Sequence, residues 1–253
     1  MHCTLEVCVD STASALAANA AALIGWSCAP TDHRRHHSSP ALLRQARLRP
    51  ACRCGTYPSP LWRFLLRPLR AGTDGRMRRR AGSAGADGIV TGVLTPAGAL
   101  DTDALRPIYA AARQAAEKAH RTVDCTLHRA FDVCCDPFAA LEAAKQLGLA
   151  TILTSGQAAS APQGAALLRQ LVEAAGQEVE ILVGAGVSAA NIPALAAQTG
   201  ARAFHLFGKQ VLDSRMTFRR EGVPMGLPGF SEFEIWQTSE ANIRAARTAL
   251  DAL

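Results

Sequence analysis

The stretch "GADGIVTGVLTPAGALDTDALRPIYAAARQAAEKAHRTVDCTLHRAFD", residues 85–132, contains a pattern that repeats through much of the chain. Residues 85–94 form an apolar run typical of a buried strand, and residues 101–120 have the apolar spacing of an amphipathic helix. Asp101 and Asp103 give this helix an acidic start. Residues 121–132 then predict a second strand. A strand, a helix and a strand in this order indicate a βαβ unit with parallel strands.

The same alternation continues from residue 136 to residue 253. We predict helices at 136–148, 161–177, 188–200 and 239–253, and strands at 149–157, 179–187 and 201–209. The stretch "LEVCVD", residues 5–10, adds a strand, and residues 20–84 leave room for two more. Eight strands predict a TIM (β/α)8 barrel, an α/β fold whose chemistry lies at the C-terminal ends of the strands. A length of 253 residues suits one such domain, spanning residues 1–253.

The composition limits the class of protein. Apolar residues make up 49% of the chain and charged residues 19%, which is ordinary for a globular protein. No apolar run reaches the roughly 18–20 residues of a membrane helix, and residues 1–11 lack the layout of a secretory signal. We therefore expect a cytoplasmic protein whose eight cysteines are mostly reduced thiols. Because these cysteines form no repeated CxxC pair, the sequence does not support a zinc ribbon.

Residues 31–80 differ sharply in charge from the rest of the chain. They hold 13 arginines, no lysine and only two acidic residues, whereas the remainder is mildly acidic. Such a break is typical of a basic nucleic-acid arm or of sequence translated in the wrong frame. In and beside this segment lie residue types that bind metals: Cys28, His33, His36, His37, Cys52 and Cys54. Their spacing matches no known zinc-ligand geometry, so an accidental cluster is the favoured interpretation over a zinc site or an unexplained basic loop.

Polar residues gather where the predicted strands end. In "LEVCVD" the two-residue alternation puts Glu6, Cys8 and Asp10 on one face of the strand. The ends of later strands supply a second group: His128, Arg129, Asp132, Ser155, Gly184, Gly186 and His205. Because the C-terminal ends of barrel strands meet at one mouth, these residues are the candidate ligand-binding and catalytic set.

One function class that fits this set is an enzyme acting on a small phosphorylated or carboxylated metabolite. Glu6 or His128 would serve as acid or base, Arg129 would bind the anionic group, and Asp132 would orient its neighbours. A structural alternative for Glu6 is a buried ion pair with Arg129, since a buried carboxylate needs a partner. His128 and His205 have a structural alternative too, as hydrogen-bonded histidines of the barrel interior.

The glycines of "GAGV" allow two interpretations. Gly184 and Gly186 precede a predicted helix, where backbone N–H groups can hold a phosphate, and TIM barrels often bind phosphate after strands seven and eight. Tight turns that require glycine explain the same residues without any ligand.

Seven motifs occur in a fixed order along the chain. They are "LEVCVDS", "AGADGIVTGVLTPAGALD", "TLHRAFD", "ILTSGQ", "GAGV…NI", "FH" and "DSRMTFRREGVPMG". In this order they resemble the CutC family, over residues 4–20 and 84–253. The resemblance implies a TIM barrel, a cytoplasmic location and a role in copper homeostasis. It also implies a Cu(I) site formed by Cys8 and by the cysteine that ends the family's second strand motif, "RIELC"; soft thiolates suit Cu(I).

Residues 21–83 depart from this family pattern, because "RIELC", "EGGTTPS" and "IRPRGGDFLYS" are all absent. When back-translated codons are read in shifted frames, "ALIGWSCA" becomes A-D-R-L-E-L-C, "RRHHS" becomes G-G-T-T and "PLWRFLLR" becomes R-C-G-D-F-C-Y. We therefore predict that residues 21–83 are frameshifted, that strands two and three are damaged, and that the histidine cluster is accidental. Cys28 lies almost where the family cysteine belongs and is a weaker metal-ligand candidate than Cys8.

The expected partners follow from these hypotheses. We expect a copper ion, Cu(I), or a small-molecule ligand, and neither nucleic acid nor membrane; a homo-oligomer is compatible with the sequence. Three functions stay open, namely a copper homeostasis protein, a TIM-barrel enzyme, and a family member that has lost its function.

Overall fold

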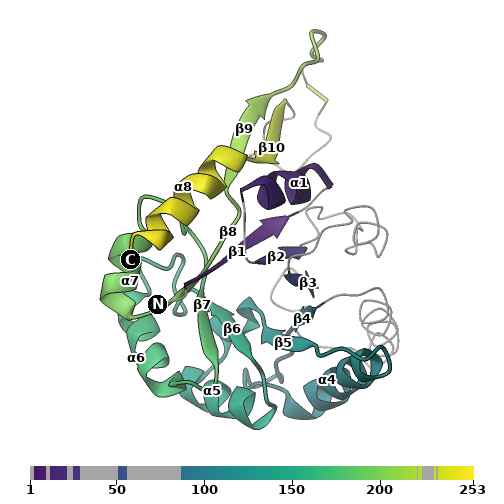
Figure 1. Cartoon of the computed structure of the whole chain (residues 1–253), viewed down its shortest axis with the longest axis vertical. Coiled ribbons are helices and arrows are strands. Elements are labelled where there is room, and N and C mark those ends of the chain that lie inside the picture. Colours follow the sequence, from purple (N-terminus) through teal and green to yellow (C-terminus); the bar gives the residue numbers. More distant parts are fainter. Residues whose placement is uncertain are drawn as a thin grey trace.

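The computed structural model describes residues 3–9, 12–21, 25–28, 51–55, 87–220, 222–223, 231 and 233–253. Eight parallel strands form a closed barrel in the order β1 to β8, and β8 pairs with β1 to complete it (Figure 1). The strands are β1 (Thr4–Val9), β2 (Gly25–Cys28), β3 (Ala51–Gly55), β4 (Gly88–Thr91), β5 (Asp124–Leu127), β6 (Thr151–Thr154), β7 (Glu180–Val183) and β8 (Ala203–Leu206). The predicted TIM-barrel fold is confirmed.

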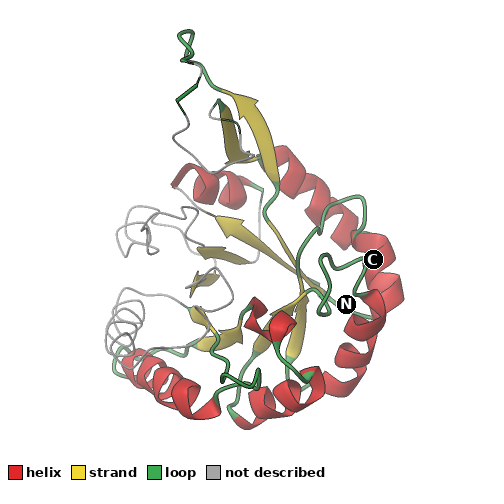
Figure 2. Ribbon diagram, turned by 180° about the vertical axis from the view of Figure 1, so that it is seen from behind, coloured by secondary structure: helices red, strands yellow, loops and turns green. Residues whose placement is uncertain are grey.

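The described helices lie outside the strands along part of the circumference of the barrel (Figure 2). They are α1 (Thr12–Ala20), α4 (Thr102–Glu117), α5 (Pro137–Gln146), α6 (Ala165–Ala175), α7 (Ile192–Thr199) and α8 (Glu240–Asp251). The Asp101 side chain accepts a hydrogen bond from Ala104 N at the start of α4, and Asp136 caps α5 in the same way with Pro137 at its first position. Within the described residues, no helix combines the length and the apolar character that crossing a bilayer requires.

Two sets of apolar side chains fill the space on either side of the strands. Leu5, Val7 and Val9 of β1 belong to the large cluster that includes helix residues such as Ile243 of α8, so they face outward. Leu153, Leu182 and Ala203 form a separate buried cluster inside the barrel. Because side chains alternate along a strand, Glu6 and Cys8 point inward.

Both strands that we expect to be damaged take their places in the backbone ladder. The β2 strand pairs with β1 and β3, and β3 pairs with β4. The described strands therefore leave no open edge in the barrel. The rest of the segment predicted to be frameshifted, including His33, His36 and His37, lies outside the described residues.

The register of the ladders defines the layers of side chains inside the barrel. Its offsets amount to a shear of eight residues around the ring, as is typical of this fold. At this shear, His205 lies one layer above Glu6, where "above" means toward the C-terminal ends of the strands. Cys8, His128 and Gly184 share the next layer.

Two local predictions differ from the structure. The strand predicted at 121–132 ends at Leu127, and Arg129–Val133 forms a 3-10 helix (η2), because the His128 side chain accepts a hydrogen bond from Ala130 N and turns the chain. After β8 the chain continues into β9 (Lys209–Asp213), which pairs antiparallel with β10 (Glu234–Thr238) in a ribbon that projects from the barrel (Figure 1). The sequence analysis did not predict this ribbon.

Candidate functional site

A buried carboxylate–imidazole pair lies in the inner layers below the barrel mouth. Glu6 of β1 and His205 of β8 are direct partners across their ladder, and Glu6 Oε1 lies 2.9 Å from His205 Nδ1. Both side chains are almost completely buried. The carboxylate can only accept here, so Nδ1 carries the proton and Nε2 of a neutral His205 has an available lone pair. The ion pair suggested between Glu6 and Arg129 does not form, since the contacts of Arg129 go to Asp132 and Ser155.

His128 lies in the layer nearest the mouth and has a defined tautomer. Its Nδ1 accepts a hydrogen bond from Ala130 N at 3.1 Å, so the proton of the neutral ring is on Nε2. Gly92, directly after β4, makes room for this ring, because a Cβ there would lie 2.8 Å from His128 Nδ1. In this state His128 is a hydrogen-bond donor at Nε2. It can therefore polarise or protonate a ligand, whereas the role of base falls to His205.

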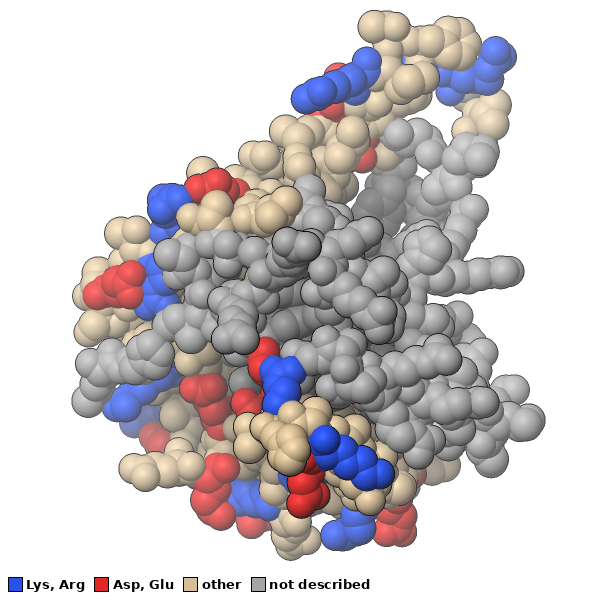
Figure 3. All heavy atoms as spheres, turned by 45° about the vertical axis from the view of Figure 1, so that its right-hand side comes forward, with Lys and Arg blue, Asp and Glu red and all other residues tan. Residues whose placement is uncertain are grey.

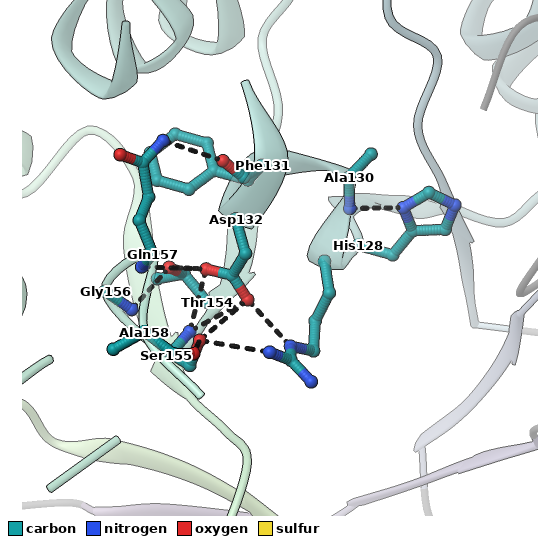
Figure 4. Close-up of polar contacts among 10 residues, drawn as sticks. His128, Ala130, Phe131, Asp132, Thr154, Ser155, Gly156, Gln157 and Ala158 are labelled. Carbon is teal, nitrogen blue, oxygen red and sulfur yellow. Dashed lines mark hydrogen bonds and ion pairs between the residues drawn. The ribbon is translucent and has the colours of Figure 1, made fainter. Parts of the chain in front are cut away.

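Asp132 joins the loop after β5 to the loop after β6 (Figure 4). One carboxylate oxygen accepts from Thr154 Oγ1 at 2.5 Å, Ser155 N at 3.0 Å and Gln157 N at 3.3 Å. The other accepts from Arg129 Nε at 2.7 Å and from Ser155 Oγ at 3.0 Å. With so many donors, Asp132 is held as a structural carboxylate, which orients Arg129 and Ser155 as the sequence analysis suggested.

Arg129 remains partly open to a ligand. Its Nε and one terminal nitrogen bind Asp132 and Ser155, yet the side chain is 41% exposed. A guanidinium that is fixed on one side and exposed on the other suits the binding of a carboxylate or phosphate. Ser155 is fully buried and its hydroxyl already contacts Ala158 O at 2.7 Å, so it supports Arg129 more than it offers a free group.

Gln157 completes the connection between the two loops, a role that the sequence analysis did not assign. Its Nε2 donates to Cys134 O at 2.9 Å, and its backbone has a positive φ of 54°. A non-glycine residue in this region is uncommon and points to a constrained loop. The "TSGQ" string places Gln157 at a strand end, but its contact with Cys134 depends on a residue 23 positions away.

The loop after β7 holds Gly184 and Gly186, as predicted, and connects to the start of α7. Gly186 has a φ of 72° and Ala185 a φ of 75°, and Asn191 closes the loop by donating to Gly186 O at 2.7 Å. A Cβ at Gly184 would lie 2.6 Å from Leu153 Cδ1 and 3.6 Å from His205 Cβ. Packing against these two side chains therefore accounts for Gly184, and it brings the loop close to His205.

The cysteines do not assemble into a metal site within the described residues. Cys8 pairs with Ser27 in the β1–β2 ladder and Cys28 pairs with Val9, so position 28 belongs to the outward face and Cys8 to the inward face. Burial raises the pKa of Cys125 and of Cys134 to about 11, which disfavours the thiolates that metals require. Among the described residues, no three metal-ligating side chains converge. Asp10 lies outside the described residues.

The closed barrel with a polar mouth defines the chain as a (β/α)8-barrel protein. Among solved structures, CutC from Streptococcus agalactiae matches with a TM-score of 0.70 at 20% identity, over 81% of this chain and 98% of that one. Phosphoribosylanthranilate isomerase from Thermotoga maritima matches with a TM-score of 0.56 at 10% identity, over the full length of both chains. At these identities the likeness concerns the fold alone.

The sequence comparisons identify the family of barrel proteins to which the chain belongs. The model of the CutC family matches residues 75–210. A CutC family protein of Chromobacterium violaceum is 43% identical over 169 residues, which cover 67% of this chain and 65% of the relative. One from Vibrio vulnificus is 44% identical over 174 residues, covering 68% and 67%. The chain belongs to the CutC family, and the matches span about two thirds of the length of these relatives.

Proposed function

We propose that the barrel mouth binds a small metabolite carrying a phosphate or carboxylate and transfers a proton to or from it. The observation that carries this proposal is the buried Glu6–His205 contact of 2.9 Å, one layer below His128. A carboxylate that orients an imidazole through Nδ1 and leaves Nε2 as the reactive atom is a common arrangement for a general base.

The remaining groups have complementary roles in this proposal. His205 Nε2 accepts a proton from the ligand, and Glu6 stabilises the imidazolium that results. The Nε2–H of His128 donates to a carbonyl or hydroxyl oxygen on which negative charge develops. The exposed side of Arg129 binds the anionic group and so fixes the ligand at the mouth. These roles need the proton of His205 on Nδ1 and the proton of His128 on Nε2, and the contacts with Glu6 and Ala130 N favour these two tautomers.

Proton exchange in heavy water tests the proposal directly. Phosphorylated and carboxylated keto compounds are incubated with the protein in D2O, and loss of the C–H signal next to the carbonyl is followed by NMR. General acid–base groups contribute about 10²–10⁴-fold to rate, so Glu6→Gln should slow the exchange by at least about 100-fold. The matched control is Asp136→Asn, a helix cap remote from the inner layers. Exchange that is equally fast in Glu6→Gln would refute the role of this pair.

Copper homeostasis is the second candidate function, and the β1–β2 register favours it for a corrected sequence. In the shifted frame, the cysteine that ends A-D-R-L-E-L-C is encoded by the last base of codon 28 and the first two bases of codon 29. With one lost base restored upstream, that cysteine becomes residue 29, on the same face as Ser27 and Cys8. Two thiolates on one face of neighbouring strands would suit Cu(I) in the reducing cytoplasm where we expect the protein to act.

A copper titration separates the two candidates. Three proteins compete with a chromophoric chelator for Cu(I) under anaerobic conditions. They are the protein with the present sequence, the frame-corrected protein, and the Cys8→Ser variant of the frame-corrected protein. Copper binding by the corrected protein that disappears in Cys8→Ser supports the second candidate. The matched control is Cys135→Ser, which removes an exposed thiol outside the barrel interior. Equal binding by both serine variants would exclude Cys8 as the ligand.

A further inference from the structure

The side chain of Phe207 lies directly after β8, next to the imidazole that we propose as the base. Ala203 belongs to the buried cluster inside the barrel, and Leu206 belongs to the large cluster outside it. The alternation along the strand therefore puts His205 and Phe207 on the inward side. Their rings meet edge to face, with centroids 6.1 Å apart and an angle of 84° between the planes. Phe207 is nevertheless 46% exposed, so it presents an aromatic surface beside the buried Glu6–His205 pair.

The backbone around Phe207 is held in place by α8. Gly208 has a positive φ of 56°, and its carbonyl oxygen accepts a hydrogen bond from Ser239 N at 2.8 Å. A Cβ at Gly208 would lie 2.8 Å from Ile243 Cγ1, so this close approach to α8 requires glycine. Lys209 Nζ lies 4.8 Å from the centroid of the Phe207 ring, which is an attractive cation–π contact. These contacts fix an exposed apolar ring at the C-terminal end of a barrel strand, where the ligand sites of this fold lie.

The groups of the proposed site follow the order of the groups in a 2-oxo acid, R–CH2–CO–COO⁻. His128 and Arg129 are adjacent after β5, and the proposed function assigns them a carbonyl oxygen and an anionic group. In a 2-oxo acid the carbonyl and the carboxylate are on neighbouring carbons. The next carbon, C3, carries the acidic hydrogens and would lie at Nε2 of His205. Its substituent R would then lie beside the ring that contacts His205, which is the ring of Phe207.

We infer that the substrate is a 2-oxo acid with an apolar, preferably aromatic, substituent on C3, and that Phe207 determines this specificity by contacting the substituent. The inference rests on the proposed function and adds the part of the ligand that carries no charge. Burial of an apolar group is favourable, and two aromatic rings gain further when they lie offset or edge to face. The proton passes from C3 to His205 Nε2 and returns to C3, so the reaction needs no oxidant and no second substrate.

Deuterium exchange at C3 of phenylpyruvate and of pyruvate tests the inference, because pyruvate has no substituent on C3. Rates are measured by NMR in D2O over a range of concentrations and corrected for exchange without protein. Removal of an apolar contact changes discrimination by about 10- to 200-fold, so Phe207→Ala should raise the KM for phenylpyruvate by at least about 10-fold. The KM for pyruvate should stay unchanged. Phe207→Leu, which keeps an apolar side chain, should give an intermediate KM for phenylpyruvate with an unchanged kcat.

The matched control is Phe218→Ala, which should alter neither KM. Phe218 is a more exposed aromatic residue, at 64%, and lies between β9 and β10. Figure 3 shows the far end of this ribbon, where basic side chains gather, projecting beyond the barrel. Circular dichroism checks that each variant is folded, and Phe207→Leu decides if Phe207→Ala is not.

Saturation-transfer NMR of phenylpyruvate gives a second measurement that does not depend on proton transfer. The phenyl protons should receive saturation from the unaltered protein and from Phe218→Ala, and much less from Phe207→Ala. Binding of this kind without any exchange would refute the proposed proton transfer and still support the role of Phe207. Exchange with the same KM values in Phe207→Ala as in the unaltered protein would overturn the inference and leave the proposed function standing. Absence of phenylpyruvate binding to the unaltered protein would also overturn the inference.

Discussion

Replacing Asp132 by asparagine should destabilise the fold strongly, although the two side chains have the same shape. Asparagine retains one oxygen for Thr154 and Ser155 N, but its NH2 group then faces Arg129 Nε, which is also a donor. Hydrogen bonds to a charged group contribute roughly 1.5–3 kcal/mol each, whereas the half-exposed Arg129 contact adds about 1 kcal/mol at most. We therefore expect the free energy of unfolding to fall by about 2–4 kcal/mol.

Urea denaturation followed by far-UV circular dichroism measures this loss, and a thermal melt gives a second value. For a chain of this size, 1 kcal/mol corresponds to roughly 2–4 °C, so Asp132→Asn should lower the Tm by about 4–16 °C. Asp136→Asn is the matched control. Asp136 accepts from Phe138 N at 2.9 Å and Ala139 N at 3.0 Å as a helix N-cap, where asparagine serves about equally well.

The location of the loss is as informative as its size. Hydrogen exchange should become faster in residues 129–134 and 154–158 of Asp132→Asn, because the carboxylate holds these two loops to each other. If Asp132→Asn is no less stable than Asp136→Asn, the negative charge at position 132 does not stabilise the protein. The reasoning about the two loops would then be refuted.

Three further outcomes follow from the described side chains. Burial holds the pKa of Cys125 at about 11 in the folded protein, while the unfolded thiol ionises near 9.0, so this thiol should lower the free energy of unfolding by up to about 2–3 kcal/mol between pH 9 and pH 11. Because Cys134 has a similarly raised pKa, Cys125→Ala should reduce the slope in urea titrations by the share of Cys125, and an unchanged slope would contradict the burial of this thiol. Iodoacetamide at pH 8 should modify the exposed Cys135 well before the buried Cys134, whose pKa burial also raises to about 11. Mass spectrometry measures the order of modification, and earlier modification of Cys134 would contradict this expectation. Gly92→Ala should displace the His128 ring and cost about 1–3 kcal/mol, with altered imidazole nitrogen shifts in NMR; unchanged shifts would contradict the close contact.

The sequence predicted the barrel because its signals are local. Alternating apolar segments, the capping residues Asp101 and Asp136, and glycines such as Gly148 and Gly200 after helices act within a few residues of the elements that they delimit. The ribbon of β9 and β10 was missed for the opposite reason. Its strands are separated by about twenty residues, and their pairing of Leu212 with Ile235 leaves no periodic signal in either segment.

The candidate site was predicted as a set of residues but not as a set of contacts. Strand ends identified Glu6, His128, Arg129, Asp132 and His205, since the fold brings these ends together. Which groups pair depends on register, and register is a long-range property: the Glu6–His205 contact joins residues 199 positions apart. The sequence analysis suggested an ion pair between Glu6 and Arg129 because their charges are opposite. Opposite charge does not determine which side chains come into contact.

Resequencing the DNA that encodes residues 20–84 would decide the frame hypothesis. Missing bases would make the protein an ordinary barrel of this family with a cysteine at position 29, and would remove the histidine cluster. A confirmed sequence would leave Cys28 as the ladder partner of Val9 and not of Cys8.

The connection between the loops after β5 and β6 has a consequence for protein engineering and for divergence within the family. Barrel enzymes commonly acquire new specificities by exchanging single loops on a constant scaffold. Here Asp132 from one loop binds the backbone of the other, and Gln157 binds back to Cys134. A graft of either loop alone would leave buried donors without acceptors, so the two must be transplanted as one cassette. The loop after β7 belongs to the same connected group, because Ala161 N of the loop after β6 donates to Ala185 O at 2.9 Å, in addition to the Asn191 bridge to Gly186 within the loop after β7.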